Sequence, residues 1–467
     1  MINMKRYFDI LILLTLAVLI LFPPLLVGMA NLSNATSAKS EKDKTLYYES
    51  AAKFLFWRTD LLEKAGLAAV SWNPDRAINL LLTAQNYNKL SVDGQLAMGD
   101  AYIAIGKPET AISEWENIVP ASAQSVIEIS KRLATAYHNA GNYSQELIIL
   151  RKWLEIDNEN ILANKYIGVL LAAEANSEAL EHFSFLANNS QNKAEQFKQV
   201  ISALESTDGD ESYRLTKSGQ ALAGLNEWPL AEIAFLRAIE SNPKYGMAWA
   251  WFGLARQYNN KPGALNALDY ALKLDPKSAG IHSLLGTYWN KAKKGKEAQQ
   301  EFATAISLEP ANAAWWAAYA NETAQNDLPK ALNAYLQAIN LEPQNSDYWY
   351  ALAAFCVDNN AYIEDYGLKA ALQAYALNPE NPAYMDLLGR AQMASGQNSA
   401  AEAMFKKIIT RYGNESNAYA YHFHIGLLYL QTGRNMEAYN EFSKTIILDP
   451  NGSYGLQAKN IIERYYP

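Results

Sequence analysis

Apolar residues recur along most of the chain at the spacing of a helix that is buried along one side. In AQQEFATAISLEP, residues 298–310, apolar residues stand four, seven and eight positions after Ala298. These positions share one face of an α-helix, because one turn takes about 3.6 residues. The pattern predicts a helix over residues 298–308, and Pro310 marks the turn that follows it.

The same order of small residue, large apolar residue, small residue and proline returns several times. Similar segments begin at Ala231, Ala264, Ala331 and Ala438. About a dozen residues before each stands another small residue, so each unit is predicted to contain two antiparallel helices. Such a pair cannot bury both apolar faces alone, so we expect the units to stack and share a core. Small residues allow close approach of the helices, and large ones such as Phe302 are expected to fill the gap between successive units.

The amino terminus has a different pattern. Lys5 and Arg6 precede an apolar run from Ile10 to Gly28, close to the ~20 residues that span a bilayer as a helix. A retained membrane anchor is the favoured interpretation, and a signal peptide cleaved after Ala30 is the alternative. Either places the rest outside the cytoplasm, in a single-pass or a secreted protein. The polar residues 31–44 predict a short flexible spacer, with the fold beginning near Thr45.

The repeat resembles the tetratricopeptide repeat (TPR) family. Prolines 243, 276, 310 and 343 recur at the period of about 34 residues that is typical of this family. The family motif matches one copy at Leu285, Gly286, Trp289, Ala298, Phe302, Ala305 and Pro310. The resemblance covers roughly ten units. It implies an all-α fold: an α-solenoid whose antiparallel helix pairs form a right-handed superhelix, preceded by one N-terminal transmembrane or signal helix.

The regularity of the repeats suggests how the chain is divided. We expect an anchor or signal peptide over residues 1–30, the spacer over 31–44 and a degenerate array over 45–206. A regular array over 207–450 and a capping helix over 451–467 follow. The segment from Asn192 to Ser212 supplies one extra helix and an acidic turn, and is interpreted as the joint between the two arrays.

Composition and motifs narrow the function. The formal charge is -8 and the pI is about 5.4, which disfavours nucleic-acid binding. The single cysteine, Cys356, excludes an internal disulfide and is expected to pack in the core. His422 and His424 lie two apart, which on a helix directs them to nearly opposite sides and disfavours a metal site. With no recognisable catalytic motif, the sequence predicts a non-enzyme with no catalytic residue, metal or cofactor.

In the TPR family, the first helix of each unit lines a concave groove that receives a peptide or partner helix. Carried over by position, the resemblance implies a neutral, polar and aromatic lining. The groove candidates are Tyr213, Thr216, Gln220, Met247, Leu254, Gln257, Ser283, Thr287, Asn290, Asn321, Asp347, Tyr350, Asp386, Arg390 and Phe423.

The leading hypothesis is a membrane-anchored scaffold without catalytic activity. It would bind protein or peptide partners in the groove and contribute to the assembly or organisation of extracytoplasmic envelope complexes. The alternative is a carbohydrate-binding accessory of an envelope polysaccharide system, because the 29 tyrosines and 11 tryptophans include aromatic rings that could stack on sugars. Most tryptophans stand at motif positions and are expected in the core, whereas Trp251 and Trp315 are less well explained.

Overall fold

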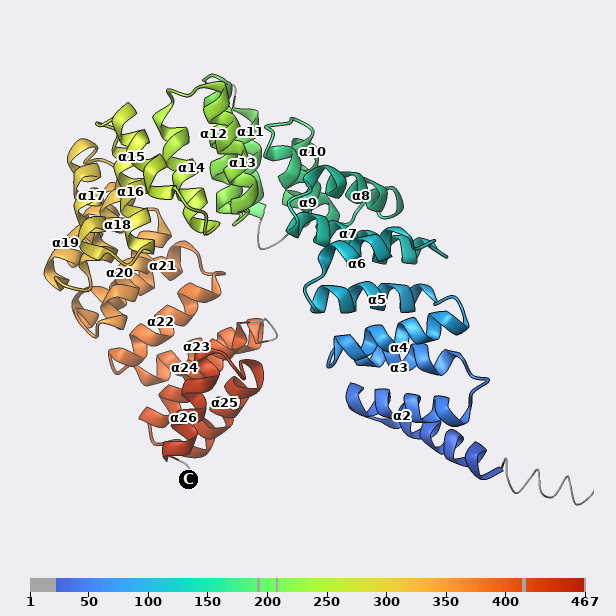
Figure 1. Cartoon of the computed structure of the whole chain (residues 1–467). Coiled ribbons are helices and arrows are strands. Elements are labelled where there is room, and N and C mark those ends of the chain that lie inside the picture. The colour runs from blue at the N-terminus through green and yellow to red at the C-terminus, as the bar shows by residue number, and fades with distance from the viewer. Residues whose placement is uncertain (1–21, 191–193, 207–208, 414–416, 466–467) are drawn as a thin grey trace, which may run out of the picture. The chain divides into compact units, whose positions relative to one another are not determined.

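The computed structural model describes residues 22–190, 194–206, 209–413 and 417–465, and over these ranges all regular secondary structure is helical. Antiparallel helix pairs follow one another in chain order (Figure 1). The expectation of an all-α solenoid of helix pairs is confirmed. The chain divides into two compact units, one of Met1–Asp208 with Lys217–Leu230, the other of Gly209–Thr216 with Ala231–Pro467.

The first unit contains the less regular helix pairs. Its helices are α2 (Glu41–Phe54), α3 (Asp60–Ala69), α4 (Pro74–Tyr87), α5 (Val92–Ala104), α6 (Pro108–Glu116), α7 (Ala123–Asn139), α8 (Tyr143–Ile156), α9 (Ile161–Ala172), α10 (Ala179–Asn189) and α11 (Ala194–Glu205). The boundary between the units passes through α12 (Glu211–Gly224) and α13 (Trp228–Ser241).

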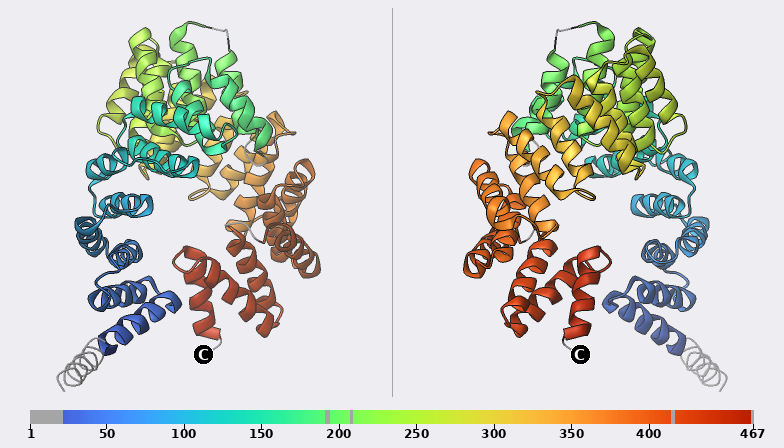
Figure 2. Two further views of the ribbon diagram at one scale, coloured as in Figure 1. Left: turned by 90° about the vertical axis from the view of Figure 1, so that its right-hand side faces the viewer. Right: turned by 90° about the vertical axis from the view of Figure 1, so that its left-hand side faces the viewer.

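The second unit contains the regular pairs, which stack in chain order in the further views of Figure 2. Its helices are α14 (Gly246–Tyr258), α15 (Ala264–Leu274), α16 (Ala279–Lys291), α17 (Gly295–Leu308), α18 (Ala313–Thr323), α19 (Leu328–Leu341), α20 (Ser346–Asp358), α21 (Leu368–Leu377), α22 (Pro382–Ala394), α23 (Asn398–Tyr412), α24 (Ala418–Gln431), α25 (Asn435–Leu448) and α26 (Ser453–Tyr465). The last helix, α26, packs on α24 and α25.

A left-handed residue ends the first helix of several pairs. Gly396 and Gly433 have φ values of 78° and 75°, and Asn260 fills the equivalent place with φ 54°. Glycine and asparagine adopt this conformation at low cost, and it lets the next amide reach back to the helix. After Gly433, for example, the Arg434 amide donates to the Tyr429 carbonyl oxygen at 2.8 Å. The chain then reverses direction into the second helix.

Close helix packing within several pairs depends on a glycine beneath an aromatic ring. A Cβ placed at Gly286 would lie 2.7 Å from the Phe302 ring, and one at Gly389 would lie 2.7 Å from Phe405. The expectation that Phe302 fills the gap between successive units therefore needs correction. Its ring packs on the glycine of its own pair, because the absent side chain leaves room there for an aromatic face.

The pair formed by α20 and α21 has a single π-helical turn between its two helices. Residues Ile363–Gly367 form this turn, η1, just before α21. Gly367 lies against Cys356, and a Cβ there would be 2.7 Å from the cysteine Cβ. Cys356 is completely buried, as expected from its position in the repeat.

The amino-terminal segment is more structured than the sequence suggested. Residues 22–37 are helical and α2 begins at Glu41, so most of the segment 31–44 is helix and not an extended spacer. Most of the apolar run from Ile10 lies outside the described residues. Among the described ranges, no helix has both the length and the apolar character needed to cross a bilayer.

Candidate binding surface

In the second unit, the first helices of successive pairs line one side of the stack. α14 contacts α16, and α18, α20, α22, α24 and α26 contact each other in succession. The second helices instead contact the first helices that precede and follow them in the chain. The first helices therefore lie along one side of the stack and the second helices along the other.

The groove candidates from the sequence occupy different environments in the structure. Buried members are Thr216, Leu254, Asp386 and Phe423; half-buried members are Tyr213, Gln220, Met247, Gln257, Ser283, Thr287, Tyr350 and Arg390; exposed members are Asn290, Asn321 and Asp347. Gln220 belongs to the first unit and the others to the second.

The buried candidates cannot contact a partner directly, so their assignment to the groove surface is corrected. Phe423 packs against Phe442 and Tyr454, with ring centroids 5.8 and 5.2 Å away. Tyr454 belongs to α26, which therefore covers this position. Thr216 donates its hydroxyl to the Ser212 carbonyl oxygen at 2.8 Å and stabilises its own helix.

The structure brings Asp347 and Tyr350 of α20 together with Tyr384 of α22. The Tyr384 hydroxyl donates to Asp347, and its ring lies 5.2 Å from that of Tyr350. Burial, with help from the Asp347 carboxylate, raises the pKa of Tyr384 to about 12. The hydroxyl therefore stays protonated and remains a donor at neutral pH. Tyr384 was not among the groove candidates selected from the sequence.

Two further links continue along the same helices. Arg390 of α22 donates to Asp358 of α20 at 2.5 Å, and Asp386 of α22 lies 2.7 Å from His424 Nδ1 of α24. These contacts tie the first helices of successive pairs together. The result is an ordered, partly buried polar and aromatic network whose charged groups are paired with each other.

Farther toward α16, Asn290 and Lys291 face a cavity of about 520 Å³ that is also lined by Lys293, Gly295, Glu322 and Gln325. The Asn290 amide donates to the carboxylate of Glu322. Burial raises the pKa of Glu322, and the bond from Asn290 opposes that rise. Asn321, the neighbouring candidate, instead accepts the Tyr335 hydroxyl at 2.5 Å.

The first unit contains a cavity of about 360 Å³ between α5, α6 and α7. It is lined by Asp100, Ile103, Trp115, Glu128, Lys131, Arg132, Thr135, Ala136 and Asn139. None of these residues was selected from the sequence. A signal was nevertheless present, because Asp100 directly follows the small residue Gly99, as Thr287 follows Gly286 in the regular array.

Charges at this cavity are largely balanced among themselves. Arg132 pairs with Asp100 at 2.8 Å and with Glu128 at 2.8 Å. Ile103 is 41% exposed and supplies an apolar surface beside these groups. An apolar floor next to oriented polar groups suits a short peptide segment that inserts one apolar side chain.

Candidate reactive groups have structural partners. His422 Nδ1 lies 2.5 Å from Glu441, whereas His424 faces Asp386, so the two rings serve different contacts. Burial raises the pKa of the Cys356 thiol to about 12, which disfavours the reactive thiolate. No group of three or more histidine, cysteine and acidic side chains suited to a metal occurs in the described part of the chain.

Several tryptophans form hydrogen bonds with the turns between pairs. The indole N–H groups of Trp249, Trp316 and Trp349 each donate to the carbonyl oxygen of the proline six positions earlier, at 2.9, 2.8 and 2.8 Å. Trp251 stacks on Phe235 with a centroid distance of 5.8 Å. These contacts give the four tryptophans structural roles in turns and packing.

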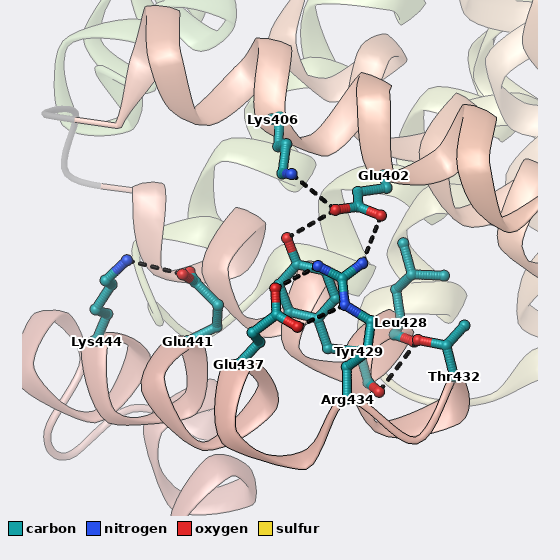
Figure 3. Close-up of polar contacts among 9 residues, drawn as sticks. All are labelled: Glu402, Lys406, Leu428, Tyr429, Thr432, Arg434, Glu437, Glu441 and Lys444. Carbon is teal, nitrogen blue, oxygen red and sulfur yellow. Dashed lines mark hydrogen bonds and ion pairs between the residues drawn. The ribbon is translucent and has the colours of Figure 1, made fainter.

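A polar network on the second helices links consecutive pairs (Figure 3). Arg434, at the start of α25, pairs with Glu402 of α23 at 2.6 Å and also with Glu437. Its guanidinium lies 4.1 Å from the centre of the Tyr429 ring. Arg434 and Lys406 lower the pKa of Glu402 to about 2. The network fixes neighbouring pairs to each other.

The described ranges form an α-helical array of successive antiparallel helix pairs. Residues 387–453, which cover most of α22 through α25, match the tetratricopeptide repeat family model. This part of the chain is therefore similar to tetratricopeptide repeats. No curated protein matches it.

Solved structures with similar helical arrays include a chain of the APC/C hetero-tetramer Cut9–Hcn1. The two chains are 13% identical with a TM-score of 0.41, and the match covers 97% of this chain and 98% of that one. Yeast Tom70 is 16% identical with a TM-score of 0.40, covering 96% of each chain. YrrB, described as a TPR protein with an unusual peptide-binding site, is 17% identical with a TM-score of 0.33, covering 42% of this chain and 98% of its own. At these TM-scores the similarities carry no further argument.

Proposed function

We propose that this protein is a non-catalytic, membrane-anchored scaffold that binds protein partners through extended peptide segments. Its repeats would lie outside the cytoplasm and organise envelope complexes. The observation that carries the proposal is the cavity between α5 and α7, where exposed Ile103 adjoins oriented polar groups. Repeat arrays of this kind expose extended surfaces that suit such partners.

The chemistry of the cavity favours a peptide with a small or medium apolar side chain. Arg132 is already paired with two carboxylates, so a strongly charged ligand would have to break those pairs. Thr135 and Asn139 lie along the same helix at the cavity and offer hydrogen-bonding groups to a peptide backbone. Affinity would come from burying the apolar side chain over Ile103, and register from the polar groups.

Retention of the amino-terminal segment is supported by its packing. Gly28 is buried, and a Cβ there would lie 2.7 Å from Leu55. Cleavage after Ala30 would remove Gly28 and Leu25 from a small core that includes Leu55 and Leu61. An anchor that remains attached keeps this core intact.

Capture from native membranes tests the proposed function. We expect Ile103→Glu in the full chain to lower the yield of crosslinked partner at least ~10-fold, because burying one unpaired charge costs on the order of 1.4 kcal/mol or more. The paired change Tyr350→Ala with Asn321→Ala tests the second unit in the same way. Ile148→Glu is the matched control, since Ile148 is 48% exposed on α8 and does not line the cavity. Equal yields from Ile103→Glu, Ile148→Glu and the unaltered chain would refute the assignment of the cavity.

A further inference from the structure

The helix over residues 22–37 has two contrasting sides at its start. Gly28 and Ala35 are buried, and Leu25 and Leu32 pack against Leu55 and its neighbours. On the opposite side Phe22, Leu26 and Met29 are 52%, 53% and 55% exposed. The first part of this helix therefore presents large apolar side chains to its surroundings.

The exposed side changes character near residue 30. Before this point its large side chains are apolar, whereas afterwards Ser33, Asn34, Thr36 and Ser37 are exposed. Thr36 and Ser37 donate their hydroxyls to the Ser33 carbonyl oxygen, at 2.8 and 3.0 Å. Such a change along one helix is the pattern of a segment that leaves an apolar environment and enters water.

Exposed aromatic residues lie close to the part of this helix, near residue 30, where its exposed side changes from apolar to polar. The turn between α2 and α3 carries Phe56, 79% exposed, and Trp57, 55% exposed, with ring centroids 5.2 Å apart. The turn adjoins Gly28, because a Cβ there would contact both Leu55 and Phe54. Among the described residues, Trp57 is the only tryptophan with so large an exposed fraction.

We propose that Phe56 and Trp57, together with the exposed apolar side of residues 22–29, form a contact with the lipid bilayer at its polar boundary. Tryptophan is enriched at this depth, where its ring is partly apolar and its N–H reaches water. Lipid is favoured over a protein occupant because this surface continues the uncharged apolar sequence from Ile10. The contact orients the first helix pair on the membrane and rests on the proposed anchoring of the chain.

Basic residues around the turn are compatible with a lipid surface. Lys53 lies in the last turn of α2 and is exposed, next to the aromatic turn. Arg58 is not free, because it pairs with Asp60 at 2.7 Å. The binding therefore depends on the apolar and aromatic side chains more than on charge, and we expect it in neutral phosphatidylcholine vesicles.

Quenching by brominated lipids tests the contact in the full chain. The protein is reconstituted in phosphatidylcholine vesicles whose acyl chains carry bromine near the headgroups or near the bilayer centre. Bromine near the headgroups is expected to quench tryptophan emission, and Trp57→Phe should remove most of that quenching. Trp72→Phe is the control, because the Trp72 indole donates to Thr45 at 3.0 Å and is not among the exposed residues.

Flotation with the vesicles separates the two levels of the proposal. Flotation with equal quenching in the unaltered chain and Trp57→Phe would overturn the contact and leave anchoring intact. A chain that does not float would overturn both anchoring and the contact. Flotation with quenching that depends on Trp57 supports both.

Discussion

Every histidine has a polar partner in the structure, which assigns these residues to local contacts. The pairs are His138 with Glu146, His182 with Asn164, His282 with Glu301, His422 with Glu441 and His424 with Asp386. His282 and His422 hold the two helices of a pair together, whereas His424 joins two first helices. At His138 and His182 the pKa is shifted, so these two residues make stability sensitive to pH.

His138 is expected to stabilise the first unit more at low pH than at high pH. The bond to Glu146 is the main reason that its pKa is raised, Glu227 adds to the rise, and burial and Lys165 oppose it. A raised folded pKa gives a contribution that is complete below the unfolded value of ~6.5 and is lost as pH rises through the folded pKa. Burial raises the pKa of Glu146, which acts in the same direction. His138→Gln should lower stability by about 1 kcal/mol near pH ~5.5 and by less near pH ~8, measured by urea unfolding.

His182 provides a control of opposite sign. Burial lowers its pKa, so its contribution is present above ~6.5 and is lost as pH falls toward the folded pKa. His182→Gln should therefore cost more near pH ~8 than near pH ~5.5. Parallel pH profiles for the two variants would contradict the assignment of His138.

At the scale of helices and turns, the same tryptophan-to-proline hydrogen bond recurs between several pairs. The second helix ends before a proline, and the tryptophan that opens the motif of the next helix donates to the carbonyl oxygen of that proline. Asn312 then caps α18 by accepting from the Ala314 amide at 3.1 Å. The turn is thus fixed by side chains as well as by the backbone of the proline.

Two adjacent tryptophans allow this turn to be tested. Trp316 donates to the Pro310 carbonyl oxygen, whereas the neighbouring Trp315 has a buried indole N–H without a hydrogen-bond partner among the described residues. Trp316→Phe should lower stability by about 1 kcal/mol more than Trp315→Phe, because only the first change breaks a hydrogen bond. Thermal unfolding followed by circular dichroism measures the difference. Equal losses would show that ring size, and not the hydrogen bond, decides both effects.

The sequence predicts these elements well where the repeat is regular. Spacing around Gly286 and Phe302 indicated both helices and their buried face. It did not indicate which aromatic ring lies over which glycine, because that depends on how the two helices cross. Periodicity alone therefore placed Phe302 between pairs. In the structure its ring packs on Gly286 within its own pair.

The binding surface was less predictable for two physical reasons. Position in the repeat selected one side of each first helix, but Phe423 is covered by α26, whose packing no motif describes. In the first unit the motif is irregular, and Gln220 was the only groove position assigned there. The residues after Gly99 and Ala134, Asp100 and Thr135, stand in the same phase as the regular candidates and line the cavity.

At the scale of the whole molecule, the core is a series of neighbouring clusters. In the second unit one cluster includes residues from Ala320 of α18 to Ala391 of α22, and the next includes residues from Met385 of α22 to Ala458 of α26. The two clusters share helix α22, and the buried residues of each cluster come only from neighbouring helix pairs. Damage to one pair should therefore weaken its neighbours first.

Two matched substitutions at opposite ends of the second unit test this locality. Phe405 and Phe235 are both fully buried. Phe405→Ala should cost about 3–5 kcal/mol and reduce hydrogen-exchange protection in α22 to α26, with α14 and α15 unchanged. Phe235→Ala should do the reverse, reducing protection around α13 to α15 and sparing α25 and α26. Equal loss of protection across the whole unit from either change would show that it unfolds as a single cooperative body, and that stability is not built pair by pair.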